Sequence, residues 1–143
     1  MENRDLLNEA IEVYTRFLKY LNEFVSEPAA GYELSFDQYL ILSDVANEKE
    51  LTLVKIANRR NVTRAAISRQ VKGLLNKGLL TQITNPNDRR QMFLELTPKG
   101  IEAEKRIKER VEARFDEWVQ EFGRTKAKSI IDFIHKFGDK FGE

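Results

Sequence analysis

The sequence predicts two short helices separated by only two residues, a spacing that few folds can accommodate. The first helix covers the stretch "LTLVKIANRR" and the second covers "TRAAISRQVKGLLNKG". The dipeptide "NV" stands between them, and Asn61 suits the left-handed backbone of a tight turn. Thr63 is a good N-cap for the second helix, and Gly78 is a good residue to follow its end. Together these features predict a helix-turn-helix.

The apolar pattern changes directly after the second helix. Apolar residues recur about every 3.6 positions up to Gly78, and about every 2 positions in "LLTQIT" and "QMFLELT". These two segments are predicted to be strands, and "NPNDRR" between them is rich in turn-forming residues. Residues 79–97 are therefore expected to form a β-hairpin with Arg89 and Arg90 at its tip. A helix-turn-helix followed by a hairpin is the arrangement of a winged helix, in which the hairpin is the wing.

Helices are also predicted on the N-terminal side of this segment. The stretch "DLLNEAIEVYTRFLKYLNEFV" is amphipathic, and Pro28 and Gly31 in "SEPAAGYELS" are expected to end it. Ser35 and Gln38 have the spacing of a capping box at the start of the next helix. That helix is apolar around most of its circumference, so it is expected to be buried.

The C-terminal side is predicted to be helical as well. Thr97 is a candidate N-cap and Pro98 suits the first position of a long helix that ends at Gly123, before a last helix. A chain of 143 residues with 41% apolar residues is long enough for one domain with its own core. We expect a single, mainly α-helical domain with a small hairpin, in which residues 35–97 form the winged helix-turn-helix and residues 1–27 and 98–143 form flanking helices.

Charge is strongly segregated along the chain, although the net charge is only +1. Residues 1–50 carry 4 Lys+Arg and 11 Asp+Glu, residues 51–91 carry 9 and 1, and residues 92–143 carry 11 and 11. A positive segment of this kind attracts polyanions. A basic helix face that is merely solvated would explain the same charges, so charge alone leaves both interpretations open.

The second helix of the pair predicts which surface would meet a polyanion. Its apolar positions define an inner face, and the remaining face is small and basic. Arginine can bond both acceptors of guanine in the major groove, and small residues allow the helix to approach closely. A merely solvated helix would carry charges of both signs, yet no acidic residue stands between positions 51 and 87. We therefore predict a DNA-binding face. It consists of Thr63, Arg64, Ala65, Ser68, Arg69 and Lys72.

The arginines of the wing are the second predicted contact with DNA. A hairpin that carries Arg89 and Arg90 is narrow enough to enter a minor groove, where the negative potential is strongest. Asp88 beside them repels phosphate, but its carboxylate can hold one guanidinium in a fixed orientation. The alternative is an ordinary turn with an exposed ion pair that contributes less than about 1 kcal/mol. The neighbouring recognition helix favours the groove interpretation.

These residues carry a resemblance to a known family. The run from Leu53 to Gly100 resembles the winged-helix core of the multiple-antibiotic-resistance regulator (MarR) family. The motifs that carry the resemblance are "VTRAAISRQVKGLLNKGLL", the Asp-x-Arg formed by Asp88 and Arg90, and "LTPKG" after the wing. They cover about a third of the chain, and the flanking helices agree with the family in number and order only.

The resemblance implies a homodimer held by the N-terminal helix and the two C-terminal helices, bound to double-stranded DNA at a pseudo-palindromic operator. It implies that the second helix reads the major groove, that Arg90 enters the minor groove and that Asp88 supports the wing. A repressor released by a small effector, aromatic or anionic, is the expected mode of regulation. Two departures matter: Gln82 stands where the family often has a basic residue, and the chain has no cysteine, which excludes oxidant sensing by a thiol.

Other classes of function find little support in the sequence. There is no Gly-rich phosphate loop, nucleophile elbow or Cys-His pair, so no enzyme is expected and no cofactor is implied. The lone His135 without cysteine makes a weak transition-metal site, and no metal is expected. No apolar run approaches the roughly 18 residues that span a bilayer. The acidic start "MENRDLLNEA" lacks an apolar secretory core, so a cytoplasmic protein without a membrane partner is expected.

Two alternatives stay open. A winged helix can serve as a protein-interaction module without sequence-specific DNA binding, but such surfaces usually present aromatic or aliphatic anchors, which the predicted basic face lacks. The second alternative concerns several aromatic side chains that could line an effector pocket or could simply belong to the core and the dimer interface. They are Tyr14, Phe17, Tyr20, Tyr39 and Trp118.

Overall fold

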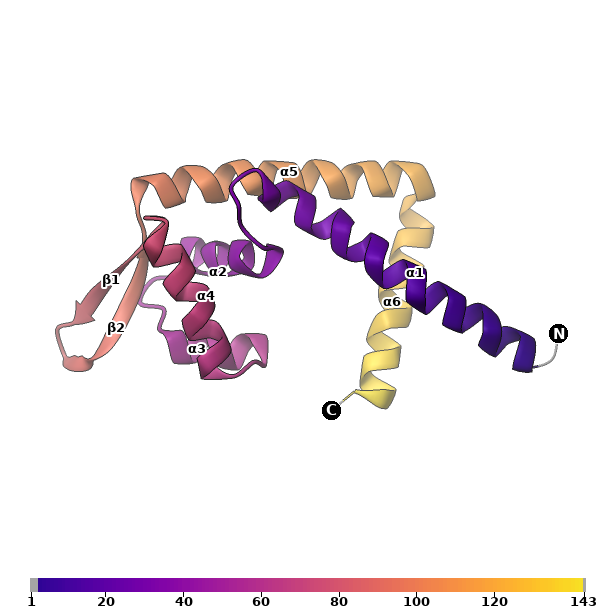
Figure 1. Cartoon of the computed structure of the whole chain (residues 1–143), viewed down its shortest axis with the longest axis horizontal. Coiled ribbons are helices and arrows are strands. Elements are labelled where there is room, and N and C mark those ends of the chain that lie inside the picture. Colours follow the sequence, from indigo (N-terminus) through magenta and orange to yellow (C-terminus); the bar gives the residue numbers. More distant parts are fainter. Residues whose placement is uncertain (1–2, 143) are drawn as a thin grey trace. The chain divides into compact units, whose positions relative to one another are not determined.

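The computed structural model describes residues 3–142, which fold into helices and one two-stranded antiparallel hairpin. The predicted helical ranges 1–27 and 98–143 thus extend beyond the described residues at positions 1, 2 and 143. Figure 1 shows the elements in chain order. They are α1 (Asn3–Ala30), α2 (Phe36–Asn47), α3 (Leu53–Arg60), α4 (Arg64–Asn76), β1 (Leu80–Asn85), β2 (Asp88–Leu96), α5 (Pro98–Phe122) and α6 (Arg124–Phe141).

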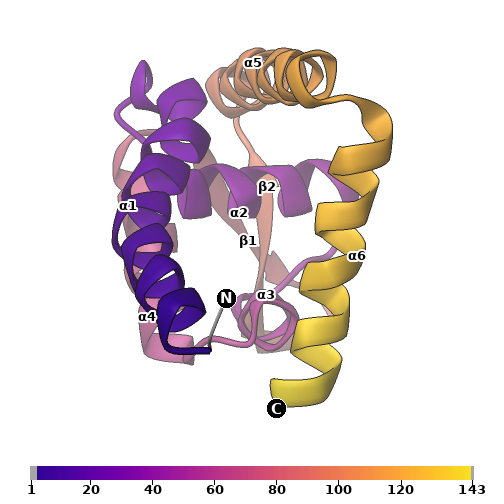
Figure 2. The same cartoon turned by 90° about the vertical axis from the view of Figure 1, so that its right-hand side faces the viewer.

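The chain forms two compact units, Met1–Lys108 and Glu109–Glu143. The first unit contains the winged helix-turn-helix and the first turns of α5, while α5 itself continues without a break into the second unit. In Figure 1 the pair α3–α4 lies beside the hairpin, and Figure 2 shows β1 and β2 beyond α2 and α3. The predicted mainly α-helical winged helix is therefore confirmed.

The core of the first unit is built from apolar faces that meet around α2. Ile41 and Leu42 of α2 are 1% and 0% exposed, which confirms the expectation of a buried helix. Each of the other elements of the winged helix contributes at least one side chain that is nearly or fully excluded from water. These are Ile56, Val71, Leu74, Leu80, Leu94 and, from α5, Ile107, and Leu51 just before α3 is buried as well. Burial of this apolar area is the main free-energy term that holds the elements together.

The ends of the short helices follow the predicted local chemistry. Ser35 and Gln38 form both halves of the capping box. The Thr63 hydroxyl accepts a hydrogen bond from the Ala66 N–H at the start of α4. Asn61 has φ 53° and ψ 46°, so the turn between α3 and α4 uses the left-handed conformation that asparagine tolerates. Gly78, with φ 71°, follows the end of α4 as expected.

The predicted end of the first helix was wrong. Helix α1 continues through Pro28 to Ala30, and the turn begins at Gly31. A proline at this position removes one backbone hydrogen bond and crowds the carbonyl four residues earlier, so other contacts must hold the last turn. Pro28 and Ala29 are both buried, and their packing fixes this last turn.

The predicted extent of the hairpin tip was also wrong. Strand β2 begins at Asp88, so only Pro86 and Asn87 form the turn, and Arg89 and Arg90 lie in the strand. The strands pair in register from Leu80 opposite Leu96 to Thr84 opposite Met92, and the next pair is Asn85 opposite Asp88. Residues 89–91 are therefore extra on β2 and form a β-bulge. The turn-forming residues predicted that the chain reverses direction here. They did not predict the bulge, because the bulge depends on how the two strands pair.

An ion-pair cluster fastens α3 to α2. The Arg60 guanidinium donates to the Asp44 carboxylate from Nε and Nη2, at 3.1 and 2.7 Å, and to the Leu40 carbonyl at 3.0 Å. Arg59 pairs with Glu48, and its Nη1 lies 3.7 Å from Asp44 Oδ1. The Asp44 side chain is only 14% exposed. Because it is partly shielded from water, this cluster stabilises the fold more than an exposed pair would.

We expect Asp44→Ala to destabilise the protein by about 1–3 kcal/mol, because the half-buried Arg60 guanidinium loses its charged partner. Urea denaturation measures the free energy of unfolding. The matched control is Asp116→Ala, at an exposed position of α5, which should change that free energy by less than about 0.5 kcal/mol. Equal effects of the two substitutions would show that the cluster does not stabilise the fold.

Candidate nucleic-acid interface

Helix α4 turns its apolar side to the core and its basic side to solvent. Ile67, Val71 and Leu74 are 5%, 1% and 0% exposed. The opposite face is open to solvent along the whole helix, as the predicted DNA-binding face requires. All of its predicted members are exposed: Thr63, Arg64, Ala65, Ser68, Arg69 and Lys72.

The basic residues of the central segment fall into two groups. Arg60 is bonded to Asp44 of α2, and Arg59 is bonded to Glu48, the residue that follows α2. The hydrogen bond that Arg59 donates to Glu48 raises the pKa of Arg59 further. Lys77 donates to the Glu33 carbonyl. These side chains stabilise the fold. The segregation of charge along the sequence could not predict this role.

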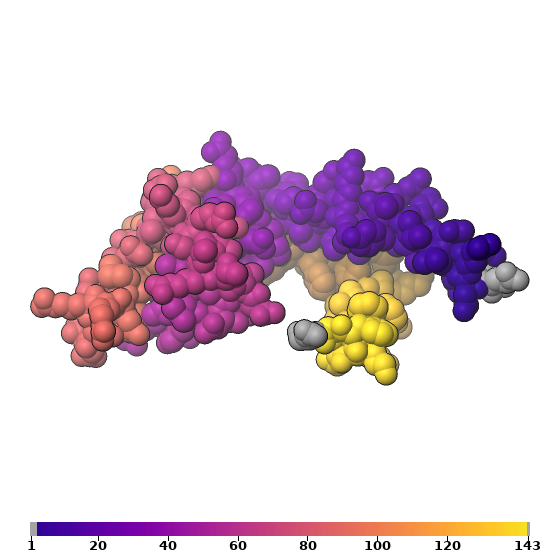
Figure 3. All heavy atoms as spheres, turned by 60° about the horizontal axis from the view of Figure 1, so that its bottom comes forward, coloured from indigo at the N-terminus to yellow at the C-terminus, as the bar shows by residue number. Residues whose placement is uncertain are grey.

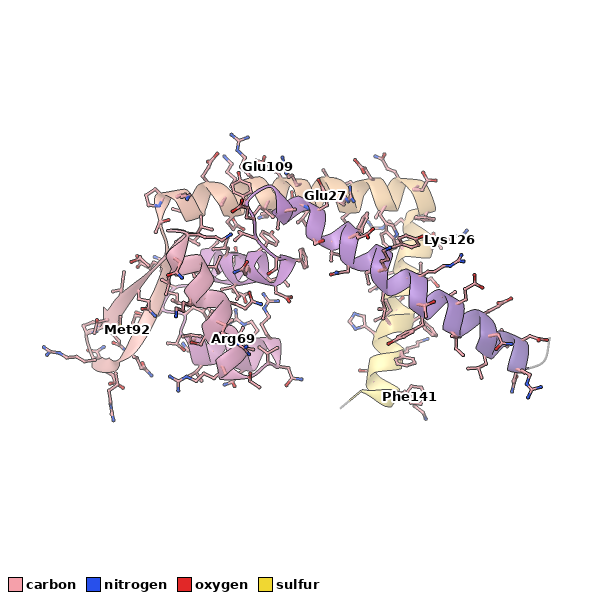
Figure 4. The ribbon with its side chains drawn as sticks, viewed as in Figure 1. Glu27, Arg69, Met92, Glu109, Lys126 and Phe141 are labelled. Carbon is pink, nitrogen blue, oxygen red and sulfur yellow. The ribbon has the colours of Figure 1, made fainter. Side chains whose placement is uncertain are left out.

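The second group faces water. Within residues 3–142, no salt bridge involves the basic side chains of α4 or Arg89. Unpaired guanidinium and ammonium groups are the ones free to neutralise phosphates and release counterions. The positive surface is therefore concentrated on α4 and the wing, rather than spread over the helix-turn-helix. Figure 4 labels Arg69 on α4 and Met92 on β2, the two elements that carry this surface.

The wing holds Arg90 by two hydrogen bonds to one carboxylate oxygen. Asp88 Oδ1 accepts from the Arg90 backbone N–H at 3.0 Å and from Arg90 Nε at 3.4 Å. The Arg90 side chain is nevertheless 94% exposed, so its outer nitrogens remain open to a ligand. Asp88 thus limits the orientations of the guanidinium while leaving its outer nitrogens accessible.

The turn of the wing is stabilised by its own side chains. Asn85 Oδ1 accepts from the Asn87 N–H at 2.9 Å, a local turn that asparagine commonly forms. Asn85 Nδ2 also donates to Gln91 Oε1 at 3.0 Å, across the bulge. Figure 3 shows the hairpin as a projection beyond the surface of α3 and α4. These bonds favour one conformation of a segment that carries both arginines.

An open groove lies between the wing and the helices. Its volume is about 780 Å³, and it joins the two basic surfaces, since Arg64 of α4 and Arg90 of the wing both line it. Lys55 of α3 and its N-cap residue Thr52 line it as well, together with Gln82. Lys55 was not among the predicted DNA contacts. Its position in the exposed first turn of α3, next to the apolar face, was the signal that could have indicated it.

The aromatic candidates for an effector pocket are divided between the core and the surface of α1, and Trp118 lies in the second unit. Tyr39 is 5% exposed in the core, whereas Tyr14, Phe17 and Tyr20 are 66%, 51% and 62% exposed on α1. Among the described residues, no three His, Cys, Asp or Glu side chains are grouped so that they could hold a metal ion. Within the same residues, no helix has the length and apolarity needed to cross a membrane.

Comparison with known proteins agrees with this geometry. The family model described as MarR family matches residues 34–92. An uncharacterized HTH-type transcriptional regulator of Staphylococcus aureus is 31% identical over 102 residues, which cover 71% of this chain and 67% of the relative. Fold, family model and relative together define a winged helix-turn-helix, DNA-binding transcription regulator. The chain belongs to the MarR family.

Solved structures show the same fold. The Staphylococcus aureus MarR protein in complex with salicylate and kanamycin is 26% identical, with a TM-score of 0.68, over 97% of this chain and 93% of that one. The transcriptional repressor CouR bound to a 23-mer DNA duplex is 21% identical, with a TM-score of 0.81, over 96% and 98% of the two chains. The second likeness concerns the fold alone.

We expect Arg90→Ala to weaken DNA binding without changing the stability of the fold, since the side chain is 94% exposed. Loss of one phosphate or groove contact should reduce affinity about tenfold and lower the slope of log affinity against log salt by about 1. Fluorescence anisotropy at several salt concentrations measures both. Arg110→Ala, at an exposed position of α5, is the control with the same change of charge. Unchanged affinity of the Arg90 variant would exclude the wing from the interface.

Proposed function

We propose that the protein is a homodimeric repressor that binds a pseudo-palindromic operator and is released from it by a small molecule. The observation that carries the proposal is the unpaired basic face of α4 together with the wing arginine that Asp88 orients. In this proposal residues 35–97 bind DNA, and residues 1–27 and 98–143 form the dimer.

Each basic surface is assigned to a different groove. Helix α4 would lie in the major groove, where arginines can bond guanine and Ala65 and Ser68 allow close approach. The wing would place Arg90 in the adjacent minor groove, with Arg89 on the phosphates. Two such subunits would need recognition helices about 34 Å apart to enter successive major grooves.

Exposed apolar side chains support a dimer. Large apolar groups that are about half exposed gather on α1 and, in the second unit, on α6. On α6 the rings of Phe133, Phe137 and Phe141 follow one another with centroids 6.4 and 5.1 Å apart, and they are 66%, 57% and 70% exposed. Soluble monomers rarely expose apolar patches of this extent, so a partner surface is expected over them.

Control by a small molecule is the third part of the proposal. It is supported by the family and by the salicylate complex of the Staphylococcus aureus relative. A ligand that binds better to a dimer with the wrong spacing of its recognition helices would release DNA by shifting populations. Salicylate, a small aromatic anion, is the first compound to test. If neither salicylate nor a panel of aromatic acids and aminoglycosides alters DNA affinity, effector control is excluded for those classes while DNA binding is unaffected.

We expect tight binding to the DNA upstream of the protein's own gene, and weak binding to a scrambled duplex of equal length. The affinity should fall steeply as salt rises, because several phosphates are neutralised. Electrophoretic mobility shifts over a salt series measure both. Binding to neither duplex at low salt would contradict the proposal and favour the alternative, a protein-interaction module.

We expect Phe137→Glu to shift the protein toward monomer, because a carboxylate would be buried without a partner in the proposed interface. Sedimentation velocity measures the change, and the variant should also lose operator affinity. Lys136→Glu, on the neighbouring exposed position of α6, is the control for introducing a negative charge on this helix. A Phe137→Glu dimer as stable as the wild type would place the interface elsewhere.

A further inference from the structure

The end of the recognition helix α4 is closed by a complete capping motif. The Gly78 N–H donates to the Leu75 carbonyl at 3.0 Å, and the Leu79 N–H donates to the Leu74 carbonyl at 3.0 Å. This pair of bonds, with a left-handed glycine between them, is the Schellman arrangement. This capping motif does not supply hydrogen-bond donors to the carbonyls of residues 77, 78 and 79, which lie beyond the end of the helix.

All three of these carbonyls are bonded by the start of α5. The Thr97 hydroxyl donates to the Gly78 carbonyl at 2.6 Å, and the Thr97 N–H donates to the Leu79 carbonyl at 3.1 Å. Lys99 Nζ donates to the Lys77 carbonyl at 3.1 Å. The same Thr97 oxygen accepts from the Gly100 N–H at 3.0 Å, so it also caps α5. The Thr97 side chain therefore bonds the residue that follows the end of α4 and also caps the start of α5.

Gly100 brings the two backbones into direct contact. A Cβ at this position would lie 2.0 Å from the Leu79 carbonyl oxygen and 3.0 Å from its carbon. These are backbone atoms of a residue that is 2% exposed, so they cannot rotate away as a flexible side chain could. The glycine is required by the close approach of the α4 end, and not by a left-handed conformation of its own.

We propose that Thr97 and Gly100 are positioning residues for operator recognition: they join α4 to α5, so that the orientation of the recognition helix is set by the start of α5. This inference rests on the proposed function. Helix α5 continues from this joint to Phe122 without a break, so the proposed dimer region and the recognition helix share a backbone connection through the segment "LTPKG".

A purely local role for the two residues leads to different expectations. If Gly100 were an ordinary helix residue, alanine would stabilise α5, because alanine has the higher helix propensity. If Thr97 only capped α5, its loss would lower stability and leave the ratio of specific to non-specific DNA binding unchanged. In the proposed role, a variant at either position keeps the basic face of α4 but presents it to DNA in the wrong orientation. Binding to any duplex is then retained, and preference for the operator is lost.

The test compares affinity for a duplex that the wild-type protein selects from a random pool with affinity for a scrambled duplex. The variants are Thr97→Val, Thr97→Ser and Gly100→Ala. The matched control is Thr97→Ser, which keeps the hydroxyl group at this position. Thermal melting followed by circular dichroism shows which variants are folded.

We expect Thr97→Val and Gly100→Ala to lower the ratio of the two affinities about tenfold, through loss of a hydrogen bond or displacement of the α4 end. Thr97→Ser keeps the hydroxyl and should show the wild-type ratio of the two affinities. A folded Thr97→Val variant with the wild-type ratio overturns the inference, even if Gly100→Ala fails to fold. If the wild-type protein selects no sequence from the pool, the proposed function itself fails.

Discussion

Burial of the apolar side of α4 is the constraint on which the rest of the site depends. Because Ile67, Val71 and Leu74 are nearly excluded from water, the helix has one orientation about its axis, and Arg64, Ser68 and their neighbours must face solvent. Burial selects the rotation of α4 about its own axis, whereas the proposed joint at Thr97 sets the direction of that axis. Interactions with charged groups refine it, but burial of apolar area supplies most of the free energy.

The arginines of this protein have two different roles: some stabilise the fold through ion pairs, and others remain free to bind DNA. Arg59 and Arg60 are adjacent to the DNA-binding segment in sequence, yet their charges are compensated by Asp44 of α2 and by Glu48, which follows α2. The arginines of α4 and the wing are left without such compensation, apart from the single carboxylate of Asp88. The area of positive potential on the surface is therefore smaller than the charge of residues 51–91 suggests. It lies on α4 and the wing, the two elements suited to the two grooves of DNA.

Much of the winged helix could be predicted because its signals are local. Caps at Ser35 and Thr63, the left-handed Asn61 and the change of apolar period each depend on a few neighbouring residues. The features that were missed depend on residues distant in sequence. Packing of Pro28 and pairing across the hairpin decided the two incorrect boundaries. The roles of Arg60 and Lys55 follow from the positions of α2 and the wing, which no local pattern contains.

The bulge in the wing has a consequence for how this protein could diverge. Residues 89–91 lie outside the paired register, so Ile83 still faces Phe93 and Leu80 still faces Leu96 whatever the bulge contains. Residues could be exchanged, added or removed there without turning the inward side chains of the hairpin to the wrong face. The length of the wing and the side chains at its tip can therefore change while the pairing of the strands and the packing of the core stay the same.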